Sequence, residues 1–267
     1  MDYICFASSS SGNCALLRGG GVNLLIDAGI SMKRIRLSLR SLGLDLGDLR
    51  GVLVTHEHSD HIQSVGVLAR KYHLPVFATQ ETWQAMINKI GKVPGDQIRT
   101  IQSGRSFWLG EIGVEPFGIP HDAADPVGYR LWGGNISVST ATDLGEFTDN
   151  IYSCISGSTL ILLESNHDPD LLRANPRYSP PLKSRILGNR GHLSNEACAK
   201  ALLQLIGAGT KHVVLGHLSE ENNTPTLARN VSEGAMTREG IQPGKDVQLE
   251  VALREEVSSI FVLKETE

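Results

Sequence analysis

Short apolar runs alternate along the chain with segments in which apolar residues recur every three to four positions. A short apolar run is typical of a buried strand, whereas the three-to-four spacing is typical of one face of a helix. Met32, Ile35 and Leu39 follow the helical spacing, and Gly43 then ends the helix. The runs predict strands at 3–6, 22–26, 52–54, 76–78, 98–101, 106–109, 112–117, 128–131, 136–139, 160–163, 212–215, 247–252 and 260–263. The spacing predicts helices at 31–42, from just after residue 61 to about 72, and at 81–90, 195–206 and 224–238.

The order of these elements indicates a mixed α/β protein. Strands and helices alternate at both ends of the chain, while residues 98–138 read as a meander of short strands separated by Gly or Pro. The sequence has no internal repeat, no low-complexity tract and no linker. A chain of 267 residues is long for one domain, but α/β proteins of roughly 200–250 residues often form one. We therefore expect residues 1–267 to form a single α/β domain.

Composition excludes several protein classes. A hydrophobic content of 40% excludes a disordered chain, and no apolar run approaches the roughly 20 residues that span a bilayer. The N-terminus lacks the pattern of a signal peptide. The four cysteines show no CxxC motif, which favours reduced thiols and a cytoplasmic protein. The net charge of -4 argues against nucleic-acid binding by net charge alone, but not against a local basic groove.

The most informative segment lies directly after the predicted strand 52–54. It carries three histidines and one aspartate within six residues: His56, His58, Asp60 and His61. In an extended segment His56 and His58 point to the same side, whereas Asp60 and His61 lie where a helix begins and can turn toward a second point. A merely polar loop is a weak explanation for this density of metal-ligand side chains. The segment therefore predicts ligands for two neighbouring cations.

Three further candidate ligands each follow a predicted strand. They are His121, Asp143 and His217. Functional side chains gather where strands end on a rigid scaffold, but one such residue alone is more often a cap or a surface group. These three residues are candidate metal ligands because they occur together with the histidine-rich segment. Imidazole and carboxylate ligands suit both Zn²⁺ and Mn²⁺, so the sequence leaves the choice of metal open.

This order of motifs resembles the metallo-β-lactamase fold superfamily, whose pattern is HxHxDH, a single His, a bridging Asp and a final His. The resemblance extends from Asp27 to His217, and it implies a four-layer αββα sandwich with two divalent metal ions, zinc or manganese. The resemblance implies one metal held by His56, His58 and His121, a second held by Asp60, His61 and His217, and Asp143 bridging the two. Asp27 is a candidate hydrogen-bond partner of a ligand histidine.

A histidine and a glutamate outside the metal pattern also have candidate roles. Glu164 ends the predicted strand 160–163, and His192 precedes the helix 195–206. Their order resembles the ribonuclease Z-like phosphodiesterases, in which a His–Glu pair supplies the proton donor. Carried over by position, a hydroxide shared by the metals attacks phosphorus, His192 protonates the departing oxygen, and Glu164 orients His192. The alternative is that His192 caps the helix or makes a structural hydrogen bond.

Longer sequence segments narrow the resemblance to one branch of the superfamily. The segments 9–14 (SSSGNC), 164–168 (ESNHD), 191–196 (GHLSNE), 216–223 (GHLSEENN) and 120–129 (PHDAADPVGY) are similar to those of the YycJ/WalJ-like exonucleases. The resemblance implies a metal-dependent DNA exonuclease with 5′-to-3′ direction and a role in DNA repair. No inserted β-CASP domain is visible in the chain.

Candidate substrate contacts lie in three places. Residues 171–192 contain five basic side chains and no Asp or Glu, which favours a rim that faces phosphates over a merely solvated loop. The polar cluster 8–13 could bind a phosphate or form only a tight turn. Next to Glu164, His167 could face the cleft or cap the following helix. The candidates for substrate binding are Arg173, Arg177, Lys183, Arg185, Arg190, Ser10, Asn13 and Asn166.

The expected partner is a nucleic acid, DNA rather than RNA, with no membrane association. One alternative is a phosphodiesterase that processes RNA or small cyclic phosphates, and another is a metal-binding scaffold without activity. Hydrolysis of carbon esters or lactams is disfavoured because it does not need the pair of Glu164 and His192. The native metal, the strand preference and the oligomeric state are left open by the sequence.

Overall fold

The computed structural model describes residues 1–258 and 260–264. The chain divides into two compact units. The first unit comprises Met1–Gly118, Ala123–Ile136 and Leu253–Glu267, and the second comprises Ile119–Asp122 and Ser137–Ala252. The strands belong to two mixed seven-stranded sheets, one of which lies wholly in the first unit. That residues 1–267 act as a single domain stays a prediction.

The sheet of the first unit begins with an antiparallel hairpin and continues with parallel strands. Its hydrogen-bonded order is β14-β1-β2-β3-β4-β5-β6. β14 and the first three strands pair antiparallel, and β3 to β6 pair parallel. The strands are β1 (Asp2–Ser9), β2 (Gly12–Gly19), β3 (Val22–Ile26), β4 (Gly51–Leu53), β5 (Val76–Thr79), β6 (Ile98–Ile101) and β14 (Phe261–Val262). The helices of this unit are α1 (Met32–Ser41), α2 (Ser59–Ile62), α3 (Val65–Tyr72) and α4 (Gln80–Ile90), with short 3₁₀ turns η1 (Leu46–Asp48) and η2 (Gly95–Gln97).

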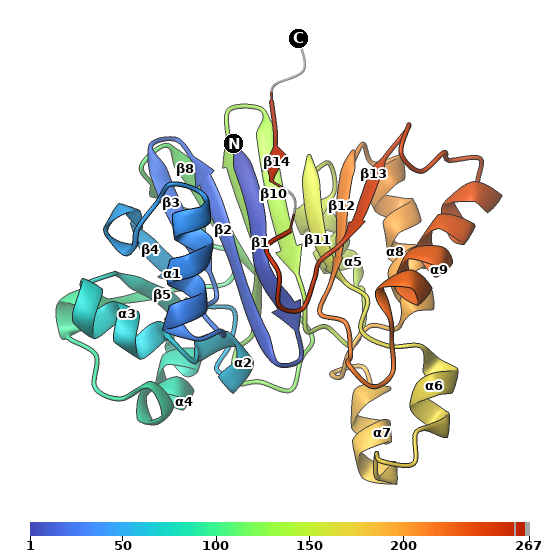
Figure 1. The fold of residues 1–267 in the computed structure, drawn as a ribbon, viewed down its shortest axis with the longest axis horizontal. Coiled ribbons are helices and arrows are strands. Elements are labelled where there is room, and N and C mark those ends of the chain that lie inside the picture. Colours follow the sequence, from blue (N-terminus) through green and yellow to red (C-terminus); the bar gives the residue numbers. More distant parts are fainter. Residues whose placement is uncertain (259, 265–267) are drawn as a thin grey trace. The chain divides into compact units, whose positions relative to one another are not determined.

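The parallel strands read as continuous apolar runs because both of their faces are buried. Leu24 and Leu25 are neighbours on β3, so they point to opposite faces, yet each is 0% exposed. One hydrophobic cluster joins Leu25 to Ile35 of α1 and Leu68 of α3. Figure 1 shows α1, α3 and α4 lying against this sheet. The helices therefore cover one face, and burying it explains why their apolar residues recur every three to four positions.

The structure differs from the sequence prediction at the polar cluster 8–13. Only Ser10 and Ser11 form the turn, because β1 continues to Ser9 and β2 already begins at Gly12. The serines of β1 are buried in the sheet, and Asn13 satisfies them: its Oδ1 accepts from the backbone N–H of Ser9 at 3.1 Å. The polarity of residues 8–13 predicts a turn, but pairing within the β1–β2 hairpin and the hydrogen bonds of Asn13 keep Ser8 and Ser9 in the sheet.

The helix predicted from just after residue 61 to about residue 72 begins later, as α3, and a separate short helix, α2, precedes it. α2 ends at Ile62 and α3 begins at Val65. Ser64 lies at the break, where its hydroxyl donates to the carbonyl of Ile30 at 2.6 Å and its N–H donates to the carbonyl of Ala28 at 2.8 Å. These bonds replace bonds that a continuous helix would make within itself, so the break positions Asp60 and His61 on a short separate turn.

The second sheet contains an antiparallel meander and four parallel strands. The antiparallel meander of β7 to β9 belongs to the first unit, and the parallel pairs of β10 to β13 belong with the second. The sequence predicted a longer meander over residues 98–138, but residues 98–101 form β6, which pairs parallel with β5 in the other sheet, and β10 pairs parallel with β11. The strands are β7 (Phe107–Leu109), β8 (Ile112–Gly118), β9 (Val127–Gly133), β10 (Ile136–Ala141), β11 (Leu160–Glu164), β12 (His212–Gly216) and β13 (Gln248–Val251). The helices of the second unit are α5 (Asp149–Ile155), α6 (Pro169–Ala174), α7 (Pro180–Ile186), α8 (Asn195–Gly207) and α9 (Pro225–Arg238).

Three helices of the second unit were not predicted. α5, α6 and α7 have six or seven residues each, which is too short for a periodic apolar pattern to stand out. α6 and α7 fall in and next to the basic stretch 171–192, and each begins with proline at its first turn, where proline is tolerated. The basic side chains therefore stand largely on helices.

Candidate side chains collect at the carboxyl ends of parallel strands in each unit. In the first unit Asp27 follows β3 and His56 lies beyond the end of β4. In the second unit Asp143 follows β10, Glu164 is the last residue of β11, and His217 follows β12. Ligands of α/β proteins bind outside the carboxyl ends of such strands. In the part of the chain that the structure describes, no helix is long and apolar enough to cross a bilayer.

Candidate functional site

Three of the candidate residues hold an uncommon backbone conformation. Asp27 (φ 57°), Asp143 (φ 60°) and His217 (φ 56°) lie in the left-handed region. Side chains other than glycine rarely adopt it, although Asp and His do so more readily than most. Such conformations persist only where the surrounding structure holds them, and they concentrate at functional sites. Asp27 and His217 directly follow the ends of β3 and β12, and Asp143 lies two residues past the end of β10.

The histidine-rich segment of the first unit brings its polar atoms together. His56 Nε2 lies 3.1 Å from His58 Nδ1, and His61 Nε2 lies 3.3 Å from Asp60 Oδ2. The rings of His56 and His61 are 4.1 Å apart, and both residues are 0% exposed. Asp60 keeps 20% of its side chain exposed. The four predicted ligands of this unit therefore form one cluster.

Asp27 fixes the orientation of His61. The imidazole Nδ1 of His61 and the carboxylate Oδ2 of Asp27 lie 2.8 Å apart, and Asp27 also accepts from the N–H of Thr55 at 2.8 Å and from its hydroxyl at 2.9 Å. A carboxylate accepts only, so the proton of His61 is on Nδ1 and its Nε2 presents a lone pair. The prediction that Asp27 contacts a candidate ligand histidine is confirmed. The role of Thr55 as a hydrogen-bond partner of Asp27 was not predicted from the sequence, although Thr55 directly precedes His56 in the histidine-rich segment.

Replacing Asp27 by alanine is expected to lower the free energy of unfolding by about 3 kcal/mol, because it leaves buried donors of Thr55 and His61 without an acceptor. Equilibrium unfolding in urea measures the change. Asp27→Asn is the matched control, since asparagine keeps one oxygen acceptor and tolerates the left-handed backbone, and it should lose less. An alanine variant as stable as the parent would contradict the role of these bonds.

In the second unit one buried carboxylate holds two histidines. Glu164 Oε1 accepts from Nδ1 of His192 at 2.8 Å and from Nδ1 of His217 at 2.7 Å. Its Oε2 accepts from the N–H groups of Leu144 at 2.9 Å and Leu193 at 3.0 Å. Burial raises the pKa of the Glu164 carboxyl, but the charges and hydrogen bonds of His192 and His217 outweigh burial and lower this pKa to about 2. Glu164 is therefore a carboxylate at neutral pH.

Asp143 lies at the centre of the second unit's candidates. Its Oδ1 is 3.4 Å from His217 Nε2, 3.8 Å from His121 Nε2 and 3.9 Å from His192 Nδ1. His121 Nδ1 lies 3.2 Å from the carbonyl oxygen of Gly191, and burial lowers the pKa of His121. Asp143, Glu164, His192 and His217 each offer an atom within 4.8 Å of the others. His192 therefore belongs to the same group of atoms as the predicted ligands Asp143 and His217.

The donor atoms fit divalent metal ions. Glu164 orients His217, and Asp27 orients His61, each through Nδ1, which leaves Nε2 as the coordinating atom. Two nitrogens bound tetrahedrally to one Zn²⁺ lie roughly 3.3 Å apart, given bonds of about 2.0–2.1 Å. The 3.1 Å between the nitrogens of His56 and His58 is close to that value. Mn²⁺ accepts the same nitrogen and carboxylate donors.

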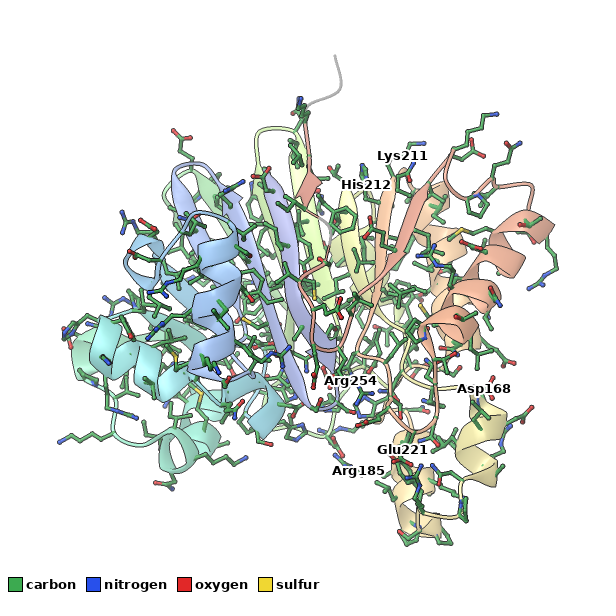
Figure 2. All side chains as sticks on the ribbon, viewed as in Figure 1. Asp168, Arg185, Lys211, His212, Glu221 and Arg254 are labelled. Carbon is green, nitrogen blue, oxygen red and sulfur yellow. The ribbon has the colours of Figure 1, made fainter. Side chains whose placement is uncertain are left out.

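Two residues of the basic stretch, Arg185 and Arg190, bind the segment that carries the candidate ligand His121. Arg190 donates from Nε and Nη2 to the carbonyl oxygen of His121, at 3.0 Å and 2.8 Å. Arg185, which is labelled in Figure 2, forms a two-pronged ion pair with Asp122, and its second bond measures 3.0 Å. This pair raises the pKa of the Arg185 guanidinium. Both residues therefore hold the segment that carries His121.

The other basic residues also have partners within the second unit. Arg177 pairs with Glu221, and Arg173 pairs with Asp170 at 3.0 Å. Lys183 donates from Nζ to the carbonyl oxygen of Arg173 at 2.6 Å. The stretch is free of acids in sequence, yet the fold supplies acidic partners from outside it. Arg173 and Arg177 keep 63% and 72% of their side chains exposed, so phosphate binding by them stays a prediction.

The remaining substrate candidates differ in exposure. Ser10 is exposed at the β1–β2 turn, whereas Asn13 and Asn166 are only 6% and 4% exposed. Asn13 Nδ2 lies 3.1 Å from His61 Nε2 and donates to Asp60 Oδ2 at 3.3 Å. Asn166 donates from Nδ2 to the carbonyl oxygen of His217 at 2.9 Å. Both asparagines thus contact candidate ligands, and their binding of substrate stays a prediction.

His167 is a buried histidine with an altered pKa. It is 1% exposed, and within residues 1–258 and 260–264 its Nε2 has no hydrogen-bond partner. Burial lowers the pKa of His167 to about 4. The cap of α6 is Asp168 rather than His167, because the carboxylate of Asp168 accepts from the N–H groups of Asp170 and Leu171. His167 is therefore neutral at physiological pH.

The depressed pKa of His167 predicts a loss of stability in acid. The unfolded chain binds a proton at this residue below about pH 6.5, whereas the folded protein binds it only below about 4, so stability falls as the pH drops through this window. Between pH 7.5 and pH 5 the expected contribution is about 2 kcal/mol. Urea unfolding of the parent and His167→Gln at both values measures it. An identical pH dependence in the two proteins would contradict the prediction.

The comparisons with known proteins agree with this geometry. A family model described as the beta-lactamase superfamily domain matches residues 22–218. Exodeoxyribonuclease YycJ of Bacillus anthracis is 40% identical over 249 residues, which cover 93% of this chain and 94% of the relative. Exodeoxyribonuclease WalJ of Streptococcus pneumoniae is also 40% identical over 249 residues, covering 92% of each chain. Among solved structures, the metallo-β-lactamase fold protein YhfI from Bacillus subtilis has a TM-score of 0.69 at 15% identity, over 97% of this chain and all of that one.

These matches cover most of the chain. The likeness to YhfI confirms the predicted fold class, mixed sheets flanked by helices in the metallo-β-lactamase fold. The chain belongs to the metallo-β-lactamase superfamily and, within it, to the family of the YycJ and WalJ exodeoxyribonucleases.

Proposed function

We propose that this protein is a metal-dependent phosphodiesterase that removes nucleotides from the end of a DNA chain. The observation that carries the proposal is the 40% identity to Exodeoxyribonuclease YycJ over 93% of the chain. The polar clusters at the strand ends of both units support it, because imidazole and carboxylate donors suit the divalent ions that such hydrolysis uses.

The proposed ligand sets follow the pattern of the superfamily. His56, His58 and His121 would hold one ion, Asp60, His61 and His217 would hold the other, and Asp143 would bridge them. The ions, zinc or manganese, would supply positive charge to the phosphate and lower the pKa of water toward neutrality. The close approach of His56 to His58 and the orientation of His61 by Asp27 support these assignments.

The proposed proton donor is His192. Its Nδ1 is held by Glu164 at 2.8 Å, so the proton that it can give to the departing oxygen is on Nε2. Its side chain is 17% exposed, whereas that of Glu164 is fully buried, so the histidine is the member of the pair that a substrate can reach. Glu164 would orient His192 without touching the substrate itself.

The proposed polarity is 5′-to-3′, and the proposed cellular role is DNA repair. Both proposals rest on the resemblance of the longer sequence segments to the YycJ/WalJ-like exonucleases, and not on the geometry of the site. Within the described residues the four cysteines are thiols that form no disulfide, which supports the reducing cytoplasm as the compartment.

One digestion experiment tests the proposed function. The purified protein is reconstituted with Zn²⁺ or Mn²⁺ and given single- and double-stranded oligonucleotides labelled at the 5′ or 3′ end, with matching RNA in parallel. Exonuclease action from the 5′ end releases the 5′ label at once as a mononucleotide, whereas the 3′ label stays on a shortening chain. Preference for RNA, or no cleavage with either metal, would overturn the proposal.

A further inference from the structure

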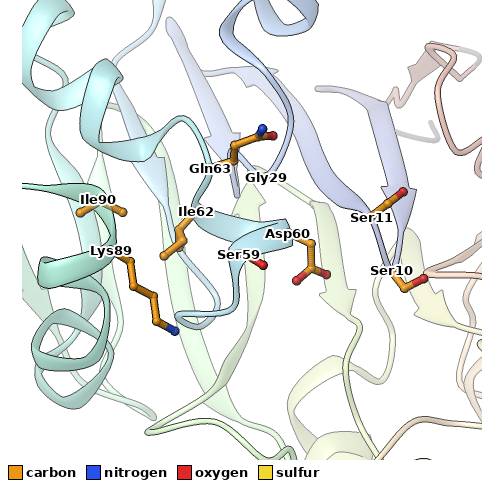
Figure 3. Close-up of a pocket in the computed structure, with 9 residues that line it drawn as sticks. All are labelled: Ser10, Ser11, Gly29, Ser59, Asp60, Ile62, Gln63, Lys89 and Ile90. Atoms are coloured by element: carbon orange, nitrogen blue, oxygen red, sulfur yellow. The ribbon is translucent and has the colours of Figure 1, made fainter.

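A cavity of about 420 Å³ adjoins the histidine-rich segment within the first unit. Figure 3 shows Asp60 and Ser59 on α2, Ser10 and Ser11 on the β1–β2 turn, and Lys89 on α4 around it. The volume falls in the range of roughly 300–1,000 Å³ that is typical of small-ligand pockets. The cavity therefore offers room for a small polar group directly beside a proposed metal ligand.

Lys89 gives this cavity a positive charge. It is the one cation among the nine lining residues, and Asp60 is the one anion. Its ammonium donates to the carbonyl oxygen of Glu57 at 3.1 Å. Glu57 lies between His56 and His58 in the sequence, so this bond ties Lys89 to the histidine-rich segment. Within the described part of the chain no carboxylate pairs with Lys89. If Asp60 holds a divalent metal ion, its negative charge is offset by that ion, and Lys89 adds a further positive charge to the cavity.

The hydroxyl and amide groups of the wall complement this charge. Ser10, Ser11, Ser59 and Gln63 are exposed and can donate hydrogen bonds to an anion. A phosphate at a chain end carries more negative charge than an internal phosphate and has three terminal oxygens, so it needs several donors and a cation. The lining of the cavity meets that need from three separate elements.

We propose that this cavity binds the terminal nucleotide of the DNA substrate, with Lys89 contacting its 5′-phosphate. The inference rests on the proposed exonuclease function. An enzyme that removes one nucleotide at a time needs a place for that nucleotide beyond the phosphate that is attacked. Lys89 would thus be a residue that determines end specificity, and phosphorylated 5′ ends would be preferred over 5′-hydroxyl ends.

The test compares kcat/KM for two oligonucleotides of the same sequence, one with a 5′-phosphate and one with a 5′-hydroxyl. We expect the parent to prefer the phosphorylated end. Lys89→Gln should lower kcat/KM for the phosphorylated substrate by about 10- to 100-fold, the loss of one charge-assisted contact, and remove the preference. Lys89→Arg keeps the charge and should keep most of the preference. Lys92→Gln is the matched control, because Lys92 is exposed and does not line the cavity.

The outcomes separate this inference from the proposed function. A parent protein that degrades DNA equally from both kinds of end overturns the role of the cavity, and so does an equal loss on both substrates in Lys89→Gln. An equal loss would mean that Lys89 attracts polyanions in general. A parent protein that hydrolyses neither DNA nor a chromogenic diester with either metal overturns the proposed function itself.

Discussion

Replacing Asp60 by asparagine is expected to lower kcat/KM for DNA hydrolysis by on the order of 10³-fold. The substitution removes the negative charge of a proposed metal ligand, and the ion that this residue would hold would supply positive charge to the attacked phosphate. The substitution keeps the size of the side chain, and 20% of the Asp60 side chain is exposed. Thermal unfolding should therefore change little. Metal content, measured by elemental analysis after dialysis, should fall with the activity.

Asp60 is a sharper choice for this test than His61. His61 is 0% exposed and lies 2.8 Å from Asp27, so its replacement would also remove one of the hydrogen bonds that hold a buried carboxylate. Asp170→Asn is the matched control, since it removes one carboxylate from a side chain that is 93% exposed. An Asp60→Asn protein with the activity of the parent would exclude the proposed metal role of this residue.

His192→Ala should lower kcat on DNA by about 10²- to 10⁴-fold, the usual worth of a general acid. The loss should be much smaller on a nucleoside p-nitrophenyl phosphate ester, because p-nitrophenolate leaves without needing a proton. Single-turnover rates on the two substrates measure the difference. His73→Asn is the control, since His73 is an exposed histidine in the left-handed region, which asparagine tolerates.

Metal content decides between the two roles that the structure allows for His192. Its ring lies with Asp143 and His217 in a group that could hold a metal ion. If His192 is the proton donor, the alanine variant keeps the metal content of the parent. A fall in bound metal that matches the fall in turnover would make His192 a ligand instead.

The fold could be anticipated largely because the metal motif and the strand pattern agree. Both faces of strands such as β3 are buried, so the sequence shows them as unbroken apolar runs that need no tertiary information to recognise. Long helices such as α8 carry enough turns for their spacing to be visible. The strand β2 was not predicted because it begins with Gly12 and Asn13, residues typical of turns. The short helices α5, α6 and α7 were not predicted because they have too few turns for a periodic pattern to show.

The basic stretch 171–192 shows a similar limit in predicting function from the sequence. Counted along the chain, residues 171–192 have no acid, and this predicted a free rim for phosphates. In the folded unit Arg185 pairs with Asp122 and Arg177 pairs with Glu221, partners that are distant in sequence. Lys89 shows the converse, since no motif marks it and yet α4 places it in the lining of the same cavity as Asp60.

The sequence by itself determined the family, the His and Asp residues that are candidates for metal ligands, and the pair of Glu164 and His192. These can be recognised from the sequence because the type of each side chain, and the apolar strand that precedes it, are both visible in neighbouring residues. Only the tertiary structure decided that Glu164 holds both His192 and His217, that Asp27 fixes His61, and which basic side chains are already paired. Hydrogen bonds and ion pairs form between atoms a few ångströms apart, and folding sets those distances independently of separation along the chain.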